Sequence, residues 1–101
     1  MLSEKGDLIT PKFLAVHTLQ APATFQEFSP VAKRAKAASS VDAYWVSSWC
    51  QLDEAGKITK LFCQWNASNI EAVRNAVCGR NVPLPLEGVY PMAIADSEDF
   101  R

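Results

Sequence analysis

The feature that most constrains the fold of this 101-residue chain is a hairpin with large apolar side chains on both of its faces. Its first strand is predicted from Tyr44 to Cys50, its turn over 53–56, and its second strand from Ile58 to Trp65. Successive side chains of a strand point to opposite faces, so the helices of one small domain can cover only one face of this hairpin. Apolar groups on the second face therefore need another cover, either a partner chain or a ligand.

The segment before the hairpin predicts a strand followed by a helix. A short apolar run predicts the strand over 12–18. Apolar residues recur at helical spacing over 24–39, opposite a basic face, and predict an amphipathic helix. Thr24 and Glu27 have capping-box form, yet Ser29–Pro30 also has the form of a helix start. We expect a short opening turn and then the main helix from Pro30.

The segment after the hairpin predicts a second helix and a last strand. Residues 68–71 form a second capping-box pattern, and Gly79 is typical of a helix end. The last strand is predicted over 88–94, where Pro91 indicates a position at the edge of a sheet.

The order strand, helix, strand, strand, helix, strand predicts an α+β, ferredoxin-like βαββαβ fold. In this fold a four-stranded antiparallel sheet carries both helices on one face and leaves the other face open. We expect a polar leader over 1–11, one domain over 12–95 and an acidic tail over 96–101.

Composition excludes several classes of function. The 10 Lys and Arg residues nearly balance the 11 Asp and Glu residues, and no basic stripe occurs, so no nucleic-acid partner is expected. The chain shows no signal-peptide pattern and no apolar stretch of membrane-spanning length, so we expect a cytoplasmic protein without a membrane partner. Its three cysteines have no CxxC spacing, which argues against a disulfide framework and a zinc ribbon.

Symmetric pairing about the hairpin turn would place Val46 opposite Cys63 and Trp49 opposite Lys60. A shift of one residue would exchange the two faces. The face under the helices would then hold Tyr44, Val46, Ser48, Cys50, Leu61, Cys63 and Trp65. The open face would hold Trp45, Ser47, Trp49, Lys60, Phe62 and Gln64.

His17 is the only histidine, and alternation places it on the same side of its strand as Phe13 and Ala15. A neutral imidazole can ligate a metal or transfer a proton near pH 7. Because the first and third strands are neighbours in this fold, His17 could lie near Lys60 and Trp49 on the open face. The alternative is a hydrogen-bonded histidine at a strand end or in a dimer contact.

The other candidates also have two interpretations. Cys63 could offer a thiolate to a metal, or it could be a small core residue. The aromatic residues could stack on a planar organic ligand, or they could pack against a partner subunit. The candidates for a ligand cleft are His17, Trp45, Trp49, Lys60 and Phe62.

Four segments carry a resemblance to a known family: Phe13–His17, the hairpin from Gly56 to Cys63, residues 67–74, and Val89–Tyr90. In their order and spacing, over residues 12–94, the chain resembles a family of small bacterial ferredoxin-like proteins of unknown function. That family includes a nickel-binding dimeric member.

The resemblance implies a homodimer whose open sheet faces meet, as in dimeric α/β-barrel proteins, some of which degrade or oxidise small aromatic compounds. It also implies nickel as a ligand, with His17 and Cys63 as the matching residues. Thr18 stands where many relatives have a second histidine. Nickel prefers several imidazole, thiolate or carboxylate donors, so both subunits would have to contribute.

Three functions follow from these observations. The first is a small dimeric protein that binds an organic ligand or a metal. The second is a cofactor-free enzyme, of monooxygenase or isomerase type, with His17 as acid or base and the aromatic residues as substrate walls. The third is a structural or regulatory interaction domain, and the sequence leaves open whether any catalysis occurs.

Overall fold

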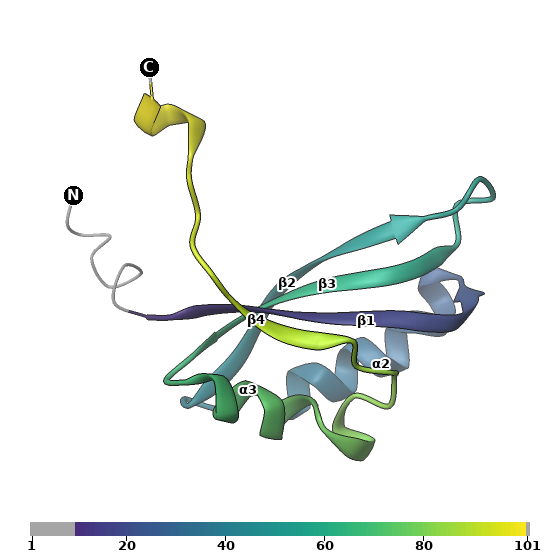
Figure 1. The fold of residues 1–101 in the computed structure, drawn as a ribbon. Helices are drawn as coiled ribbons and strands as arrows, with labels where there is room; N and C mark the ends of the chain where they lie inside the picture. Colours follow the sequence, from purple (N-terminus) through teal and green to yellow (C-terminus); the bar gives the residue numbers. More distant parts are fainter. Residues whose placement is uncertain (1–9, 101) are drawn as a thin grey trace.

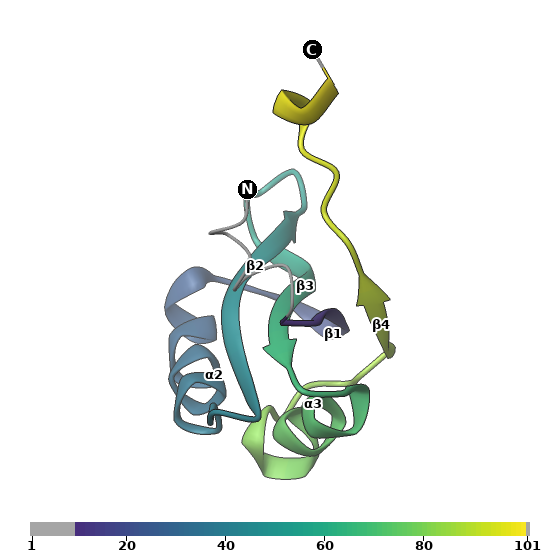
Figure 2. The ribbon, with the colours of Figure 1, turned by 90° about the vertical axis from the view of Figure 1, so that its left-hand side faces the viewer.

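The structure is a computed structural model and describes residues 10–100. Four strands form one antiparallel sheet in the order β2-β3-β1-β4. Both helices lie on one side of this sheet, so the chain has the predicted α+β, ferredoxin-like architecture (Figure 1, Figure 2). The elements are β1 (Lys12–Ala23), α2 (Phe25–Ala37), β2 (Ala43–Leu52), β3 (Ile58–Ala67), α3 (Ile70–Val77), η1 (Gly79–Asn81), β4 (Gly88–Met92) and η2 (Ser97–Phe100).

Helix α2 begins at Phe25, so the prediction of a main helix from Pro30 is wrong. The hydroxyl of Thr24 accepts a hydrogen bond from the backbone N–H of Glu27 at 3.0 Å, and the Glu27 carboxylate accepts one from the N–H of Thr24 at 2.9 Å. This reciprocal cap satisfies two free donors of the first turn. It stabilises a start five residues before Pro30, which lies inside the helix and removes one hydrogen bond from it.

Helix α3 forms where it was predicted, with a different cap. Asn69, rather than Ser68, accepts the hydrogen bond from the N–H of Ala72, at 2.9 Å. The helix ends at Val77, and Gly79 follows with φ of 59°, a conformation that favours glycine. The predicted glycine stop is therefore confirmed, and it turns the chain towards β4.

The core lies between the sheet and the two helices. Its largest fully buried side chains come from β1, β3 and α3. They are Trp65, Ile58, Leu61, His17 and Val73. Over 13–17 of β1 and 61–65 of β3, alternate residues therefore face the helices, and the residues between them face the open side of the sheet.

The register of the hairpin differs from the symmetric pairing. Ser48 pairs with Cys63, and Trp49 pairs with Phe62, because the ladder is irregular near the turn, between Gln51 and Leu52. A second irregularity lies at Val46. Trp45 pairs with Trp65 and Ser47 pairs with the next residue of β3, Gln64, so Val46 has no partner. This is the pattern of a β-bulge.

The bulge corrects three face assignments. Before the bulge, the alternation of side chains along β2 is reversed. Trp45 therefore packs on the helix side, not on the open face, whereas Tyr44 and Val46 are exposed instead of lying under the helices. The residues after the bulge, including Ser48 and Trp49, lie on the faces that were predicted for them.

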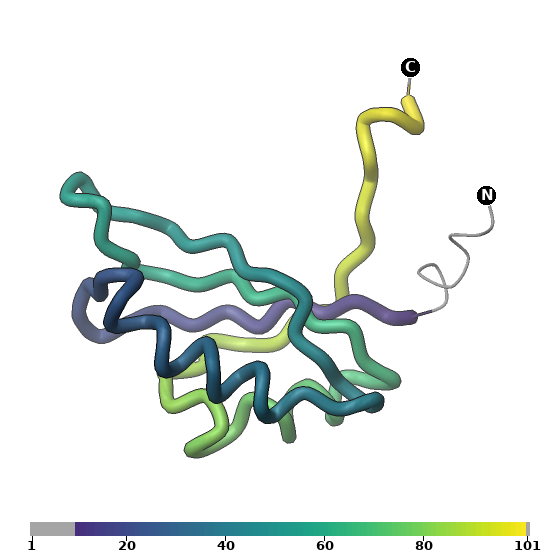
Figure 3. Tube along the Cα trace, turned by 180° about the vertical axis from the view of Figure 1, so that it is seen from behind, coloured from purple at the N-terminus to yellow at the C-terminus, as the bar shows by residue number. Residues whose placement is uncertain are grey.

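At the two ends of the chain we expect a polar leader over 1–11 and an acidic tail over 96–101. The leader predicted over 1–11 lies mostly outside the described residues. Beyond β4, the chain leaves the sheet on the side opposite the helices (Figure 1, Figure 3). Within residues 10–100, no helix is long and apolar enough to cross a membrane.

Candidate functional site

The five residues predicted to line one cleft lie on two sides of the sheet. His17 and Trp45 face the helices and line a cavity beneath α2. Trp49, Lys60 and Phe62 belong to the open side. The expected position of His17 near Lys60 and Trp49 is therefore wrong. The predicted alternation with Phe13 and Ala15 holds, but those residues are in the core, so His17 joins them there.

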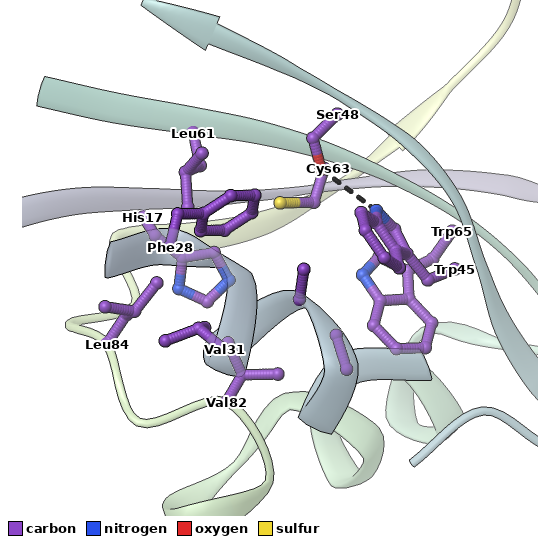
Figure 4. A pocket seen from close by; sticks show the side chains of 12 residues that line it. His17, Phe28, Val31, Trp45, Ser48, Leu61, Cys63, Trp65, Val82 and Leu84 are labelled. Atoms are coloured by element: carbon purple, nitrogen blue, oxygen red, sulfur yellow. Dashed lines mark hydrogen bonds between the residues drawn. The ribbon is translucent and has the colours of Figure 1, made fainter. Parts of the chain in front are cut away.

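The cavity on the helix side is small and apolar (Figure 4). Its volume is about 10 Å³, which is room for one water molecule at most. It lies between α2 and the sheet, and His17 and Cys63 both belong to its walls. The lining residues are His17, Phe28, Val31, Ala32, Ala35, Trp45, Ser48, Leu61, Cys63, Trp65, Val82 and Leu84.

His17 forms a hydrogen bond that joins the loop before β4 to strand β1. Its Nδ1–H donates a hydrogen bond to the carbonyl oxygen of Pro85 at 3.1 Å. Burial lowers the pKa of the imidazole, and the carbonyl groups of Pro85 and Leu84 oppose this effect in part. At pH 7 the ring is therefore neutral, and one nitrogen is occupied by a structural bond, as in the alternative interpretation of a hydrogen-bonded histidine.

Cys63 is a neutral thiol at the same cavity. Burial raises the pKa of the Cys63 thiol to about 11, although a hydrogen bond with Ser48 lowers it in part. A protonated thiol is a poor metal ligand. Trp45 completes this cluster because its indole N–H donates to the hydroxyl of Ser48 at 2.9 Å (Figure 4).

The donors brought together at this cavity do not fit a nickel ion. His17 and Cys63 are two groups, one engaged with Pro85 and the other protonated. Among residues 10–100, no group of three or more His, Cys, Asp or Glu side chains is placed to hold a metal. A stable nickel site needs more donors than this pair supplies.

The open side of the sheet carries a groove of about 110 Å³. Trp49 forms one wall, and this residue is 80% exposed. The segment after β4 forms the opposite wall with Ile94, while Leu14 and Gln64 lie on the strands between them. The full lining is Lys12, Phe13, Leu14, Trp49, Gln64, Met92, Ala93 and Ile94.

The sequence prediction missed most of this groove. Only Trp49 was among the candidate site residues, and Gln64 was placed on the open face without a role. Leu14 and Met92 could have been found by extending the alternation of side chains to β1 and β4. Phe13 and Val89 are buried. Leu14 lies one residue after Phe13 and Met92 lies three residues after Val89, so both belong to the opposite face of the sheet. Ile94 follows β4, where no strand periodicity applies.

A polar cluster lies further along β1 on the same side. The Glu87 carboxylate accepts a hydrogen bond from the hydroxyl of Thr18 at 2.8 Å and lies 3.2 Å from Nζ of Lys60. The Thr18 and Lys60 hydrogen bonds lower the pKa of Glu87. Lys60 also lies 5.5 Å from the centre of the Phe62 ring, within the range of a cation–π contact. These groups bind one another and do not line the groove.

Comparison with known proteins bears on the fold. No family model matches the chain, and no curated protein does. The crystal structure of SCO4226 from Streptomyces coelicolor A3(2) is similar, with a TM-score of 0.65 over 84% of this chain and 99% of that chain, at 14% sequence identity. At this identity the likeness concerns the fold alone, and it shows that the chain shares its α+β, ferredoxin-like fold with SCO4226.

Proposed function

We propose that the protein is a small homodimeric binding protein, which holds a planar organic molecule in the groove beside Trp49. One observation carries the proposal. A tryptophan residue that is 80% exposed forms a wall of a groove of about 110 Å³ on the face that the helices leave open. Large exposed aromatic side chains beside a concave surface are typical of ligand or partner contacts.

The lining favours an aromatic molecule with an acidic group. The indole of Trp49 offers a flat surface for stacking, and Leu14 and Ile94 add apolar contacts. The amide of Gln64 offers a hydrogen-bond donor, and the ammonium group of Lys12 offers a positive charge. An aromatic carboxylate combines the flat ring and the anionic acceptor that these side chains would recognise.

The same geometry favours binding over catalysis. In the cofactor-free enzyme hypothesis, His17 would act as acid or base between the aromatic walls. His17 lies instead on the helix side of the sheet, bonded to Pro85. Lys12 is the one ionisable side chain among the residues that line the groove, so general acid–base chemistry has little support there.

A second copy of the chain would cover the groove. Several large apolar or aromatic side chains of the open side and its C-terminal continuation are about half exposed or more, including Tyr90, Met92 and Ile94. A surface of this kind, with the polar cluster of Glu87 and Lys60 beside it, resembles the apolar centre and polar rim of a protein interface.

Fluorescence titration with 2-naphthoate tests the ligand proposal. We expect quenching of tryptophan emission in the wild type and its loss in Trp49→Ala. Gln64→Glu should weaken binding about tenfold or more, equivalent to ~1.4 kcal/mol, because it places a negative charge beside the carboxylate. The matched control is Gln51→Glu, which makes the same change at an exposed position of β2 outside the groove and should leave the affinity within about twofold.

Neutral 2-methylnaphthalene tests the role of charge and should bind more weakly than 2-naphthoate. Equal affinity of all variants for 2-naphthoate, or no binding by the wild type, would contradict the ligand proposal. Sedimentation of the wild type tests the homodimer, and a monomer at all concentrations would contradict it.

A further inference from the structure

The C-terminal segment 93–100 lines the groove with Ala93 and Ile94 and then stands away from the body of the chain (Figure 1). After β4 it leaves the sheet on the side opposite both helices (Figure 1, Figure 2). All of its residues are exposed, including two large apolar ones, Ile94 at 66% and Phe100 at 76%. Exposed apolar side chains on a projecting segment need a surface that its own chain does not provide.

The end of this segment has a defined local structure. Residues Ser97–Phe100 form the 3-10 turn η2. Asp96 caps this turn, since its carbonyl accepts a hydrogen bond from the N–H of Asp99 and its side chain accepts one from the N–H of Glu98, both at 2.9 Å. The turn therefore holds Phe100 in a defined position relative to Asp96.

The length of the chain between β4 and η2 fits a second copy of the chain. Residues 93–96 span about 13 Å when extended, at ~3.3 Å per residue. Two sheets that pack face to face are separated by about 10 Å. The four residues are therefore long enough to cross the interface of the proposed homodimer and bring η2 level with the sheet of the other copy.

The area of the open face also bears on such an arm. The four strands contain 37 residues, and at ~3.3 Å along the strand by ~4.8 Å between strands they give a flat area on the order of 600 Å². A stable protein interface buries about 800 Å² of accessible surface on each partner. The arm would add apolar surface from Ile94 and Phe100 to this contact.

We infer that segment 93–100 is a clasp, with which each copy of the chain holds the outer flank of the sheet of a second copy. This inference rests on the proposed homodimer. Ile94 forms a wall of the groove and lies at the base of the clasp, so closure of the dimer would also enclose a ligand bound beside Trp49.

Two measurements test the clasp. In the first, a photoreactive benzoylphenylalanine replaces Phe100, and the matched control carries it at Phe25, an exposed residue of α2 on the other side of the molecule. Illumination should join two chains from position 100 and not from position 25. A mixture of unlabelled and ¹⁵N-labelled protein distinguishes links between chains from links within one chain.

In the second, sedimentation compares the full chain with a chain that ends after Ala93. The shortened chain should keep its circular dichroism, and its dimer dissociation constant should rise at least about tenfold. A wild-type dimer whose dissociation constant is unchanged by the truncation, without links from position 100, would overturn the clasp and leave the homodimer in place. A wild-type monomer would overturn both.

Discussion

The bond between His17 and the Pro85 carbonyl makes a prediction about stability. His17→Leu keeps a buried side chain of similar size and removes the donor at 3.1 Å. The loss of one hydrogen bond costs about 1 kcal/mol, and the partly buried carbonyl adds to this cost when it is left without a donor. We expect a total of about 1–2 kcal/mol. In a domain of this size, that lowers the thermal midpoint by about 5–10 °C.

The burial of His17 makes stability depend on pH. The folded-state pKa of His17 lies below its ordinary value of 6.5, so the unfolded chain takes up a proton first as the pH falls. The stabilising contribution is complete above pH 6.5 and is lost as the pH falls through 6.5 towards the folded-state pKa. The lowered pKa of Glu87 affects stability only in a separate pH range, below its ordinary pKa of 4.5. Between pH 5 and 7.5, the decline should therefore come from His17.

Urea denaturation between pH 5 and 7.5 measures both effects. The wild type should lose stability on acidification, whereas His17→Leu should be less stable at pH 7.5 and nearly independent of pH. His17→Asn, whose amide can donate near the position of Nδ1, is the control that keeps a donor without the titration. A leucine variant as stable as the wild type, with the same acid slope, would refute the structural role of His17. Binding of 2-naphthoate should survive in His17→Leu, since the groove lies on the other side of the sheet.

Two further predictions concern Cys63 and Gly88. Burial raises the pKa of the Cys63 thiol from 9.0 to about 11, so the unfolded chain loses this proton first as the pH rises. The free energy of unfolding should therefore fall by about 2–3 kcal/mol between pH 9 and pH 11. Cys63→Ala should remove this alkaline decline in urea denaturation, and an equally steep decline in the variant would contradict the assignment. A Cβ at Gly88 would overlap the phenol of Tyr90, whose end is free to swing away. Gly88→Ala should therefore change the unfolding free energy by less than about 1 kcal/mol while shifting the NMR signals of the Tyr90 ring, and a loss above 2 kcal/mol would show that the ring cannot move.

The elements of the fold were predictable because their signals are local. The apolar runs of the strands and the Asn69 cap region lie within a few residues of the structure that they specify. Thr24 and Glu27 mark the start of α2 by their capping-box form, but Ser29–Pro30 offers a second, competing helix start. A proline inside a helix costs one hydrogen bond, and here the cap outweighs this cost.

The candidate site was predictable only in part, because the faces of a strand depend on pairing with its neighbours. One extra residue at Val46 reverses the alternation before it, and nothing in residues 44–50 marks that position. Trp49 lies after the bulge and was assigned to the correct face, whereas Trp45 lies before it and was not. The groove also needs Ile94, which reaches Trp49 through the path of the chain beyond the sheet.

The bulge at Val46 has a consequence for how chains of this protein avoid polymerising. Strand β2 is one edge of the sheet, and the other edge is β4, which is short and contains Pro91. A bulge interrupts the regular row of donors and acceptors that another strand would need, and a proline supplies no N–H. Fibril growth by strand addition is thereby discouraged at both edges of the sheet. In the proposed homodimer, association would use the broad face of the sheet instead.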